Sequence, residues 1–469
     1  MFDSKLTNIK KVHMIGIKGA GMTALAEILV ARGVRITGSD TEEVFYTDAL
    51  LHDIGIAPMV GFAPEHIPAD VDMIIYSSSY TIDRNAELRS ALDSSKPTLS
   101  YPEAVGELTK ERLALAVCGT HGKTTTTGLL AECLREAGKD PQALVGGKVS
   151  LWGKAALTGA GDYFVFEADE YQNKFKEYTP FGVVLNNVEW DHPDFFPDMN
   201  AYRKTFAEFL AKIPRHGLFA YCEDDSEAVN LSSTVSAHKL SYGFHKEAGL
   251  RIMEHEVIAD SQDGICQRFS MEYEDASIGF FESPLAGTHN AVNIAGAIAM
   301  CLLLQIDIEA LRTAVRNYSG TERRFEYIGK TAEGAMVYDD YAHHPTEIKA
   351  TLAAFRTLFP TRRLTVVFHP HTYSRTEALL ADFSQSFGDA TRAIIIDVYG
   401  SAREKTGAVG SAELVSAINQ FEIGKAELAH TFDEAEKILC DTLEEGDVII
   451  TMGAGDVWKL GRSLLNFLS

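Results

Sequence analysis

Short apolar runs recur along the chain, and most are followed by a longer stretch whose apolar residues have helical spacing. Continuous apolar runs are typical of strands buried on both faces of a parallel sheet, and strands that alternate with helices indicate the α/β class. We therefore predict an α/β protein with parallel sheets. Its strands are expected at residues 12–15, 34–37, 72–76, 97–102, 113–117, 163–166, 181–185, 336–338, 364–368, 393–398 and 447–452.

Length divides this pattern into domains. At 469 residues the chain is long for one domain, and the length suggests about three. The apolar runs fall into three groups, which predict α/β domains at residues 1–110, 111–321 and 322–469. Residues 223–281 contain mixed short runs, which predict a surface meander within the second domain.

Composition limits the function. Hydrophobic residues make up 46% of the chain and charged residues 23%, as in soluble globular proteins. The formal net charge of −23 argues against non-specific nucleic-acid binding and anionic membranes, although a local basic pocket can still bind a phosphorylated ligand. The six cysteines form no C-x-x-C pair, so we expect free thiols in a reducing compartment. The sequence has no signal-peptide core and no apolar run of membrane-spanning length, so we expect a cytoplasmic protein.

A glycine-rich loop follows the apolar run at 113–117, and a Lys-Thr pair then opens a helical stretch. This is the arrangement of a phosphate-binding loop, in which backbone N–H groups and the helix N-terminus approach an anion. Lys123 would reach the terminal phosphates, and the Thr124 hydroxyl would hold Mg²⁺. The spacing is shorter than in the commoner motif. The predicted nucleotide site comprises Gly119, Thr120, His121, Gly122, Lys123, Thr124 and Thr125.

A second glycine turn follows the first strand and opens a βαβ unit. Asp40 lies about 20 residues beyond the turn, where a Rossmann domain contacts a ribose. The glycine order G-x-x-G-x-G leaves three alternatives open: a dinucleotide, another nucleotide such as a uridine diphosphate, and a structural turn. The candidate ligand residues at these strand ends are Gly16, Gly19, Ala20, Gly21, Met22, Ser39, Asp40, Ser77 and Ser78.

Polar side chains end several later strands. Acidic residues and His192 follow two strands near the phosphate loop, which suits a Mg²⁺ site shared with Thr124. Asn290 and Asn293 are three residues apart near the start of a helix and either read an adenine edge or, for Asn290, cap the helix. Four histidines follow two strands of the last domain, and without a cysteine or a helical H-x-x-x-H pair they favour substrate binding and proton transfer over zinc.

Taken in order, these motifs resemble those of the Mur ligase family of peptidoglycan synthesis, and the resemblance covers nearly the whole chain. The motifs lie at residues 119–125, 167–170, 186–192, 289–293, 323–325 and 339–345. The resemblance implies a Rossmann-like N-terminal domain that binds a UDP-sugar, a central ATPase and a Rossmann-like C-terminal domain that binds an amino acid. The segments at 16–22, 368–375 and 453–456 are most similar to family members that attach L-alanine to UDP-N-acetylmuramate.

The resemblance also implies an activity and a partner set. The activity is an ATP-dependent amide ligation through an acyl phosphate, with ATP as co-substrate and Mg²⁺, or Mn²⁺, as the metal. The partners are UDP-N-acetylmuramate and a small amino acid, without nucleic acid or membrane, in a monomer or homodimer.

Matching motif positions carry individual roles. Lys123 and Thr124 would bind ATP phosphates, and Thr124, Glu167 and His192 would hold the metal. The adenine would be bound by His289, Asn290 and Asn293, the phosphates by Arg324 and the ribose by Asp340. The amino acid would meet Tyr341, His343, His371 and Arg375, with His343 handling the amine proton.

Two positions depart from the family pattern. Some relatives carry a carbamylated lysine where this chain places Phe206, so we predict none here, and Lys204 is a weak substitute. Glu170-Tyr171 resembles members that recycle a murein tripeptide, which keeps a peptide as the alternative acceptor. Two rivals from other classes are a nicotinamide-dependent oxidoreductase and a non-catalytic nucleotide switch.

Overall fold

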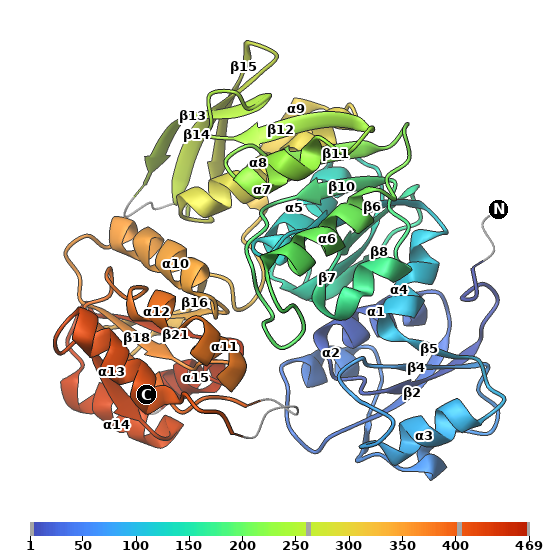
Figure 1. Ribbon diagram of the computed structural model, residues 1–469, viewed down its shortest axis with the longest axis horizontal. Helices are drawn as coiled ribbons and strands as arrows, with labels where there is room; N and C mark the ends of the chain where they lie inside the picture. Colours follow the sequence, from blue (N-terminus) through green and yellow to red (C-terminus); the bar gives the residue numbers. More distant parts are fainter. Residues whose placement is uncertain (1–3, 259–263, 401–405, 467–469) are drawn as a thin grey trace. The chain divides into compact units, whose positions relative to one another are not determined.

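The protein is described by a computed structural model that covers residues 4–258, 264–400 and 406–466. The chain divides into two compact units. The first comprises Met1–Val188, Arg203–Arg251 and Asn293–Val315, and the second comprises Glu189–Tyr202, Ile252–Val292 and Arg316–Ser469. Figure 1 labels the helices and strands of both units.

The N-terminal part of the first unit is a five-stranded parallel sheet in the order β3-β2-β1-β4-β5. The strand order reverses at β1 and β4, which is where open α/β sheets bind ligands. Its strands and helices are β1 (Lys11–Ile15), α1 (Ala20–Ala31), β2 (Arg35–Asp40), α2 (Thr47–Asp53), β3 (Met59–Val60), β4 (Met73–Tyr76), α3 (Ala86–Asp93), β5 (Thr98–Ser100) and α4 (Tyr101–Thr109).

The rest of the first unit is built on a largely parallel sheet in the order β12-β11-β10-β6-β9-β7-β8, in which only β8 runs antiparallel. The phosphate loop joins the central strand β6 to α5. The elements are β6 (Leu113–Cys118), α5 (Lys123–Glu136), β7 (Gln142–Val149), β8 (Lys154–Thr158), β9 (Tyr163–Glu167), η2 (Tyr171–Glu177), β10 (Gly182–Leu185), α6 (Met199–Leu210, from Arg203 on), β11 (Leu218–Cys222), α7 (Ser226–Ser232), β12 (His238–Gly243), α8 (Thr288–Leu303, from Asn293 on) and α9 (Ile308–Asn317, up to Val315).

The second unit contains a six-stranded sheet in the order β16-β17-β21-β18-β19-β20, parallel except for β16. Helices pack on both faces, over two apolar clusters that include Phe368 and Ile449. Its elements are β13 (Leu250–Val257, from Ile252 on), β14 (Gln267–Tyr273), β15 (Ala276–Ser283), β16 (Glu326–Lys330), β17 (Met336–Asp340), α10 (Pro345–Leu358), β18 (Leu364–Phe368), α11 (Tyr373–Ala378), α12 (Leu380–Ser384), β19 (Arg392–Ile396), α13 (Ser411–Phe421), β20 (Ala426–Ala429), α14 (Phe432–Thr442), β21 (Val448–Met452) and α15 (Trp458–Asn466).

The α/β class and the parallel strands expected from the apolar runs are confirmed. Three local expectations are not. The strand expected at residues 97–102 is found as β5 (Thr98–Ser100), but the chain then enters helix α4 at Tyr101 instead of leaving the domain, opened by a capping box between Ser100 and Glu103. α8 begins at Thr288, so His289 and Asn290 lie in its first turn, and residues 226–232 form a helix inside the expected meander. Among the described residues, no helix is both long and apolar enough to cross a membrane.

Candidate functional site

The phosphate loop has the backbone geometry that its glycines allow. Gly119 and Gly122 adopt φ values of 135° and 77°, which side chains rarely tolerate. A Cβ on Gly122 would lie 2.1 Å from Oδ1 of Asn293, so only glycine fits there. The amide of His121 donates to Oδ1 of Asn187 at 2.8 Å, and Nδ2 of Asn186 donates to the carbonyl oxygen of His121 at 3.1 Å. The loop is thus fixed at the N-terminus of α5.

Lys123 is held beside the loop. Its Nζ donates to the carbonyl oxygen of Gly119 at 2.6 Å, to that of Thr120 at 3.0 Å and to Oε2 of Glu170 at 3.2 Å. Burial lowers the pKa of Lys123, but Glu170, Asp169 and Glu167 outweigh it and leave the pKa above its usual value. The side chain is therefore a positive charge at neutral pH, placed where a nucleotide phosphate would be bound.

A hydroxyl and a carboxylate meet at the end of β9. Thr124 Oγ1 donates to Oε2 of Glu167 at 2.8 Å, and the amide of Gly146 donates to the same oxygen at 3.1 Å. Hydroxyl and carboxylate oxygens are the ligands that Mg²⁺ prefers, so the chemistry of these donors fits that ion. His192, the third expected metal ligand, belongs to the second unit.

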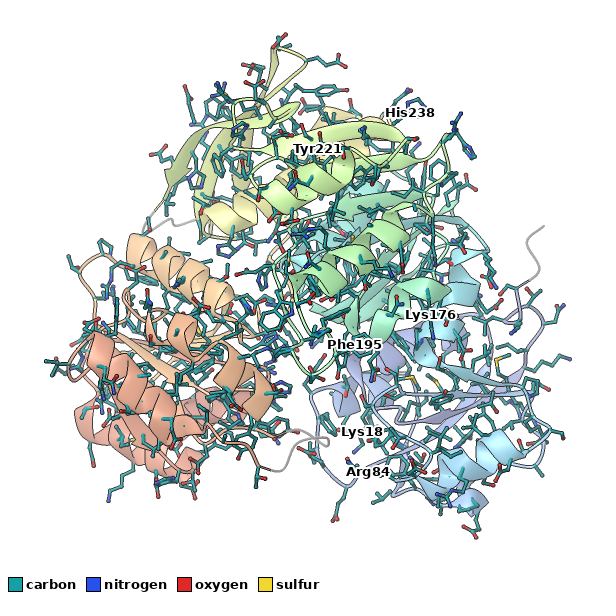
Figure 2. All side chains as sticks on the ribbon, viewed as in Figure 1. Lys18, Arg84, Lys176, Phe195, Tyr221 and His238 are labelled. Atoms are coloured by element: carbon teal, nitrogen blue, oxygen red, sulfur yellow. The ribbon has the colours of Figure 1, made fainter. Side chains whose placement is uncertain are left out.

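The N-terminal glycine turn is tightly packed. The amides of Gly16 and Ile17 donate to the carbonyl oxygen of Ser39 at 2.9 and 3.2 Å. Asp40 accepts from the amide of Lys18 at 2.7 Å and from the hydroxyl of Tyr80 at 3.0 Å. The Lys18 side chain, labelled in Figure 2, is itself occupied by backbone carbonyls after β2. Asp40 therefore braces the turn, and its contact with a ribose stays a prediction.

The serines of this region differ in orientation. The Ser39 hydroxyl donates to Oε1 of Glu87 at 2.9 Å in the protein interior, where Glu87 also contacts His13 at 2.6 Å. Ser77 Oγ accepts from a neighbouring amide, whereas Ser78 lines a cavity of about 300 Å³. Of the three, Ser78 is thus placed to meet a ligand in this cavity.

Arg323 and Arg324 have different environments. Arg323 is buried and donates to Oδ2 of Asp339 at 2.9 Å and to the carbonyl oxygen of Gly453 at 2.6 Å, which is a structural role. Arg324 is more accessible, with its Nη1 3.8 Å from Oε1 of Glu347 and its guanidinium 5.0 Å from the ring centre of Tyr341. The greater accessibility of Arg324 favours it over Arg323 for contact with a phosphate, which is the role expected for Arg324.

Asp340 is buried and His289 is half-buried. Asp340 accepts from the amides of Phe325 and Ala342 at 2.8 Å each. Burial raises the pKa of Asp340 to about 6, against the opposing effect of Arg324. Burial lowers the pKa of His289 to about 4, so its ring is neutral at pH 7. Asn290 Nδ2 donates to the carbonyl oxygen of Ala286 at 2.7 Å, a contact of a different kind from a helix cap, in which the side-chain oxygen accepts from a backbone amide.

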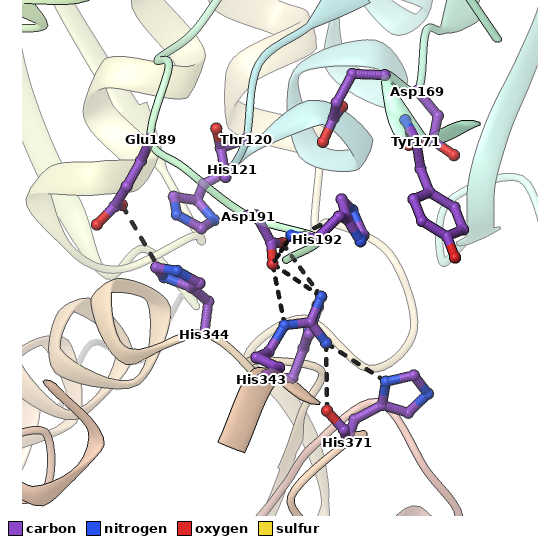
Figure 3. Close-up of polar contacts among 12 residues, drawn as sticks. Thr120, His121, Asp169, Tyr171, Glu189, Asp191, His192, His343, His344 and His371 are labelled. Carbon is purple, nitrogen blue, oxygen red and sulfur yellow. Dashed lines mark hydrogen bonds and ion pairs between the residues drawn. The ribbon is translucent and has the colours of Figure 1, made fainter. Parts of the chain in front are cut away.

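The expected amino-acid residues gather at the ends of β17 and β18 (Figure 3). Arg375 pairs with Asp191, with Nε 3.0 Å from Oδ1 and Nη2 3.2 Å from Oδ2, and its Nη1 lies 3.4 Å from Nδ1 of His371. The ring centres of His343 and His371 are 6.3 Å apart. Nδ1 of His343 lies 3.0 Å from the carbonyl oxygen of Tyr341. These four expected residues therefore lie together, with Asp191 added.

The protonation of this cluster follows from burial. Burial lowers the pKa of His343 to about 4 and holds that of His371 well below its usual value. Burial would raise the pKa of Asp191, but Arg375 outweighs it and keeps the carboxyl ionised. At neutral pH the cluster thus offers neutral imidazoles beside one paired guanidinium, which suits binding of an amino acid as its carboxylate and free amine.

The sequence reading missed several residues that shape the site. Asp191 belongs to the 186–192 motif, whose acidic groups were expected near a Mg²⁺ site. Its pairing with Arg375 was not predicted, because the two residues are 184 positions apart. Glu347, which contacts His343 and Arg324, was seen only as a helix-start residue. Glu170 and Asn187 lie in the motifs at residues 167–170 and 186–192, but no spacing rule links them to Lys123 or His121.

Comparison with known proteins gives matches over most of the chain. Three family models match: "Mur ligase family, catalytic domain" at residues 11–113, "Mur ligase middle domain" at 117–301 and "Mur ligase, glutamate ligase domain" at 323–455. The chain is 38% identical to the UDP-N-acetylmuramate–L-alanine ligase of Desulfitobacterium hafniense, over 97% of this chain and 99% of that protein. It is 36% identical to the ligase of the same name from Caldanaerobacter subterraneus, over 98% of each.

Solved structures share the fold. The UDP-N-acetylmuramate–alanine ligase of Thermotoga maritima superposes with a TM-score of 0.81 at 24% identity, over 97% of this chain and 98% of that one. A murein peptide ligase of Psychrobacter arcticus gives a TM-score of 0.75 at 24% identity, over 98% of each chain.

Proposed function

The chain belongs to the Mur ligase family, and we propose that it is an ATP-dependent ligase that joins L-alanine to the carboxylate of UDP-N-acetylmuramate in peptidoglycan precursor synthesis. The observation that carries the proposal is full-length similarity, at 35–38% identity, to relatives named for this reaction. The phosphate loop and the cluster around Arg375 supply matching chemistry for ATP and for an amino acid.

The reaction has two steps. A carboxylate oxygen of UDP-N-acetylmuramate attacks the γ-phosphorus of ATP, which forms an acyl phosphate and releases ADP. The amine of L-alanine then attacks the acyl carbon, and collapse of the tetrahedral intermediate forms the amide and releases phosphate. Catalysis comes mainly from positioning and from neutralising the phosphate charge, by Lys123 and Arg324.

Each domain has one ligand in this proposal. Residues 1–110 bind the UDP-sugar, residues 111–321 bind ATP, and residues 322–469 bind the amino acid. Thr124, Glu167 and His192 would hold Mg²⁺, which would supply positive charge to the nucleotide phosphates. The Thr124–Glu167 contact at 2.8 Å supports the first two ligands.

Arg375 pairs with the alanine carboxylate, and Tyr341, His343 and His371 surround the amine. With a pKa of about 4, His343 is neutral, and the contact of its Nδ1 with the carbonyl oxygen of Tyr341 leaves Nε2 as an acceptor. It can therefore accept a hydrogen bond from the amine and orient it toward the acyl carbon.

Phosphate release from ATP tests the function directly. We expect release that requires UDP-N-acetylmuramate and L-alanine together, and mass spectrometry should identify the alanyl product. Tight NADH binding with no ATP turnover would contradict the proposal and favour the oxidoreductase. ATP binding without substrate-dependent phosphate release would contradict it and favour the nucleotide switch.

A second candidate acceptor is a murein tripeptide, because Glu170-Tyr171 resembles the tripeptide-recycling members. The same assay with the tripeptide, glycine or L-serine in place of alanine separates the two activities. If L-alanine is the amine substrate, kcat/KM for L-alanine must exceed kcat/KM for the tripeptide.

A further inference from the structure

The loop η2 contains two consecutive strained residues. Gln172 and Asn173 adopt φ values of 58° and 54°, in the left-handed region that non-glycine residues rarely occupy. Such conformations cost free energy and persist only where the surroundings fix them, most often at sites that bind ligands.

The surroundings of η2 do fix it. Phe175 is buried, stacks on Phe209 at a ring-centre distance of 4.2 Å and meets Phe206 edge-on at 5.2 Å. Lys212 Nζ donates to the carbonyl oxygens of Phe175, Lys176 and Tyr178, at 2.6 to 3.1 Å. On the other side, α4 approaches so closely that a Cβ on Gly106 would lie 2.4 Å from the carbonyl oxygen of Glu177.

This rigid turn presents Lys174. The Lys174 side chain is only 13% exposed and forms an ion pair with Asp169, and its Nζ lies 5.6 Å from the ring centre of Tyr171. An ammonium group has three N–H donors, so donors remain after the pair with Asp169. Asp169 follows β9 two residues after Glu167, and the next residue, Glu170, holds Lys123. Lys174 is thus linked to the ATP side of the unit.

Lys174 also lines the cavity that contains Ser78. This cavity of about 300 Å³ lies between the N-terminal sheet and η2, with Tyr76, Tyr80, Ser100 and Gln172 among its walls. Its two acidic lining residues already have partners, since Glu103 accepts from Ser100 and Glu177 lies 3.6 Å from Lys176. The cavity therefore joins the proposed UDP-sugar residues to a buried cation beside the ATP residues.

We propose that Lys174 binds the reacting carboxylate of the UDP-sugar substrate and fixes it for attack on ATP. This inference rests on the proposed function. The reacting carboxylate must lie between the bound UDP-sugar and the γ-phosphate, and Lys174 connects those two places. A charged hydrogen bond from a largely buried ammonium gives both affinity and direction to that carboxylate.

The test compares two ligands and three variants by calorimetric titration without ATP. UDP-N-acetylmuramate carries the carboxylate, whereas UDP-N-acetylglucosamine has the same diphosphate without it. Lys174→Met removes the charge and keeps the stem, and Lys174→Arg restores the charge. Lys139→Met is the control, because Lys139 is an exposed lysine that does not line this cavity.

We expect Lys174→Met to weaken UDP-N-acetylmuramate binding by about tenfold or more, with UDP-N-acetylglucosamine binding and the KM for ATP unchanged. Lys174→Arg should recover part of the loss, and Lys139→Met should change the affinity for neither ligand by more than about twofold. Equal losses for both ligands would overturn the proposal in favour of a diphosphate contact. No loss for either would leave Lys174 as a structural partner of Asp169 and would also overturn it.

Turnover by the unchanged protein separates this inference from the function. If the wild-type protein converts UDP-N-acetylmuramate and L-alanine while Lys174→Met binds both ligands normally, only the role of Lys174 fails. If the wild-type protein does not turn over, the proposed function fails and the role of Lys174 falls with it.

Discussion

Asp191 and Arg375 form a buried ion pair, with Nε–Oδ1 and Nη2–Oδ2 distances of 3.0 and 3.2 Å. The pair occupies one edge of the guanidinium, and His371 lies near Nη1. Nη1 also contacts the carbonyl oxygen of His371 at 3.4 Å. A guanidinium has five N–H donors, so we expect donors beyond the Asp191 pair to bind a second carboxylate, and we infer that Asp191 orients Arg375 for the alanine carboxylate.

Asp191→Asn tests this orienting role. An amide keeps one acceptor but loses the charge that fixes the guanidinium, so Arg375 should become less well placed. We expect the KM for L-alanine to rise by about tenfold, equivalent to about 1.4 kcal/mol, while the KM for UDP-N-acetylmuramate stays the same. The melting temperature should fall, because a buried charge loses its partner.

A fall in the KM for L-alanine, instead of a rise, would reverse the role of Asp191. A lower KM for alanine in Asp191→Asn would show that Asp191 blocks Arg375 and competes with the substrate. Arg375→Lys is the companion variant, because it keeps the charge but cannot form the two-pronged contact, and its KM for alanine should also rise.

Lys123→Met should abolish most activity. The substitution removes the charge aimed at the nucleotide phosphates, and loss of one such electrostatic contact costs roughly 10²–10³ in kcat. Phosphate release in the presence of both substrates measures the effect. Lys139→Met, which alters an exposed lysine just beyond the same helix, is the control and should retain wild-type activity. Near-normal turnover by Lys123→Met, with the fold intact by circular dichroism, would defeat the proposed role.

Much of the fold could be predicted because its signals are local. The apolar runs mark strands such as β6 and β18, and the glycines at 119 and 122 mark a turn that only glycine allows. The helix at 101–109 escaped notice because its start depends on a capping pair rather than on apolar spacing.

The parts of the site that were not predicted depend on residues far apart in the sequence. The pair of Asp191 with Arg375 and that of Glu170 with Lys123 bring together different elements, and no periodicity or motif spacing encodes them. The position of the Lys174 side chain could not be predicted for a related reason, since it follows from the strained turn at Gln172 and Asn173. Metal binding by His192 and ribose binding by Asp340 stay predictions.

Glu27 should make stability depend on pH. It lies in α1 and accepts from the amide of Ala155 at 3.1 Å, and burial raises its pKa from 4.5 to about 7, with Lys154 opposing and Asp53 adding to the rise. The native state then binds a proton that the unfolded chain releases between pH 4.5 and 7. The resulting stability is fully present below pH 4.5 and is lost as the pH rises through 7.

Glu27→Gln mimics the protonated side chain and keeps an acceptor for Ala155. We expect wild type and variant to have similar stability near pH 5, and the variant to be more stable by about 2 kcal/mol at pH 8.5. Thermal melts across this range measure the difference. Glu208→Gln changes an exposed carboxylate and should leave the pH profile unchanged. A Glu27→Gln profile parallel to that of the wild type would contradict the assignment.

Activity should not depend on bicarbonate, because the chain offers no buried lysine at the position of the carbamylated lysine of some relatives. Phe206 is fully buried there and packs edge-on against Phe175, whereas the side chain of nearby Lys204 is 77% exposed. We expect equal phosphate release with and without bicarbonate in CO₂-depleted buffer, and no loss of activity in Lys204→Met. Phe206→Lys should lower stability by about 3 kcal/mol or more, since it places an ammonium among aromatic rings. Bicarbonate-dependent activity that disappears in Lys204→Met would show instead that Lys204 carries a carbamate.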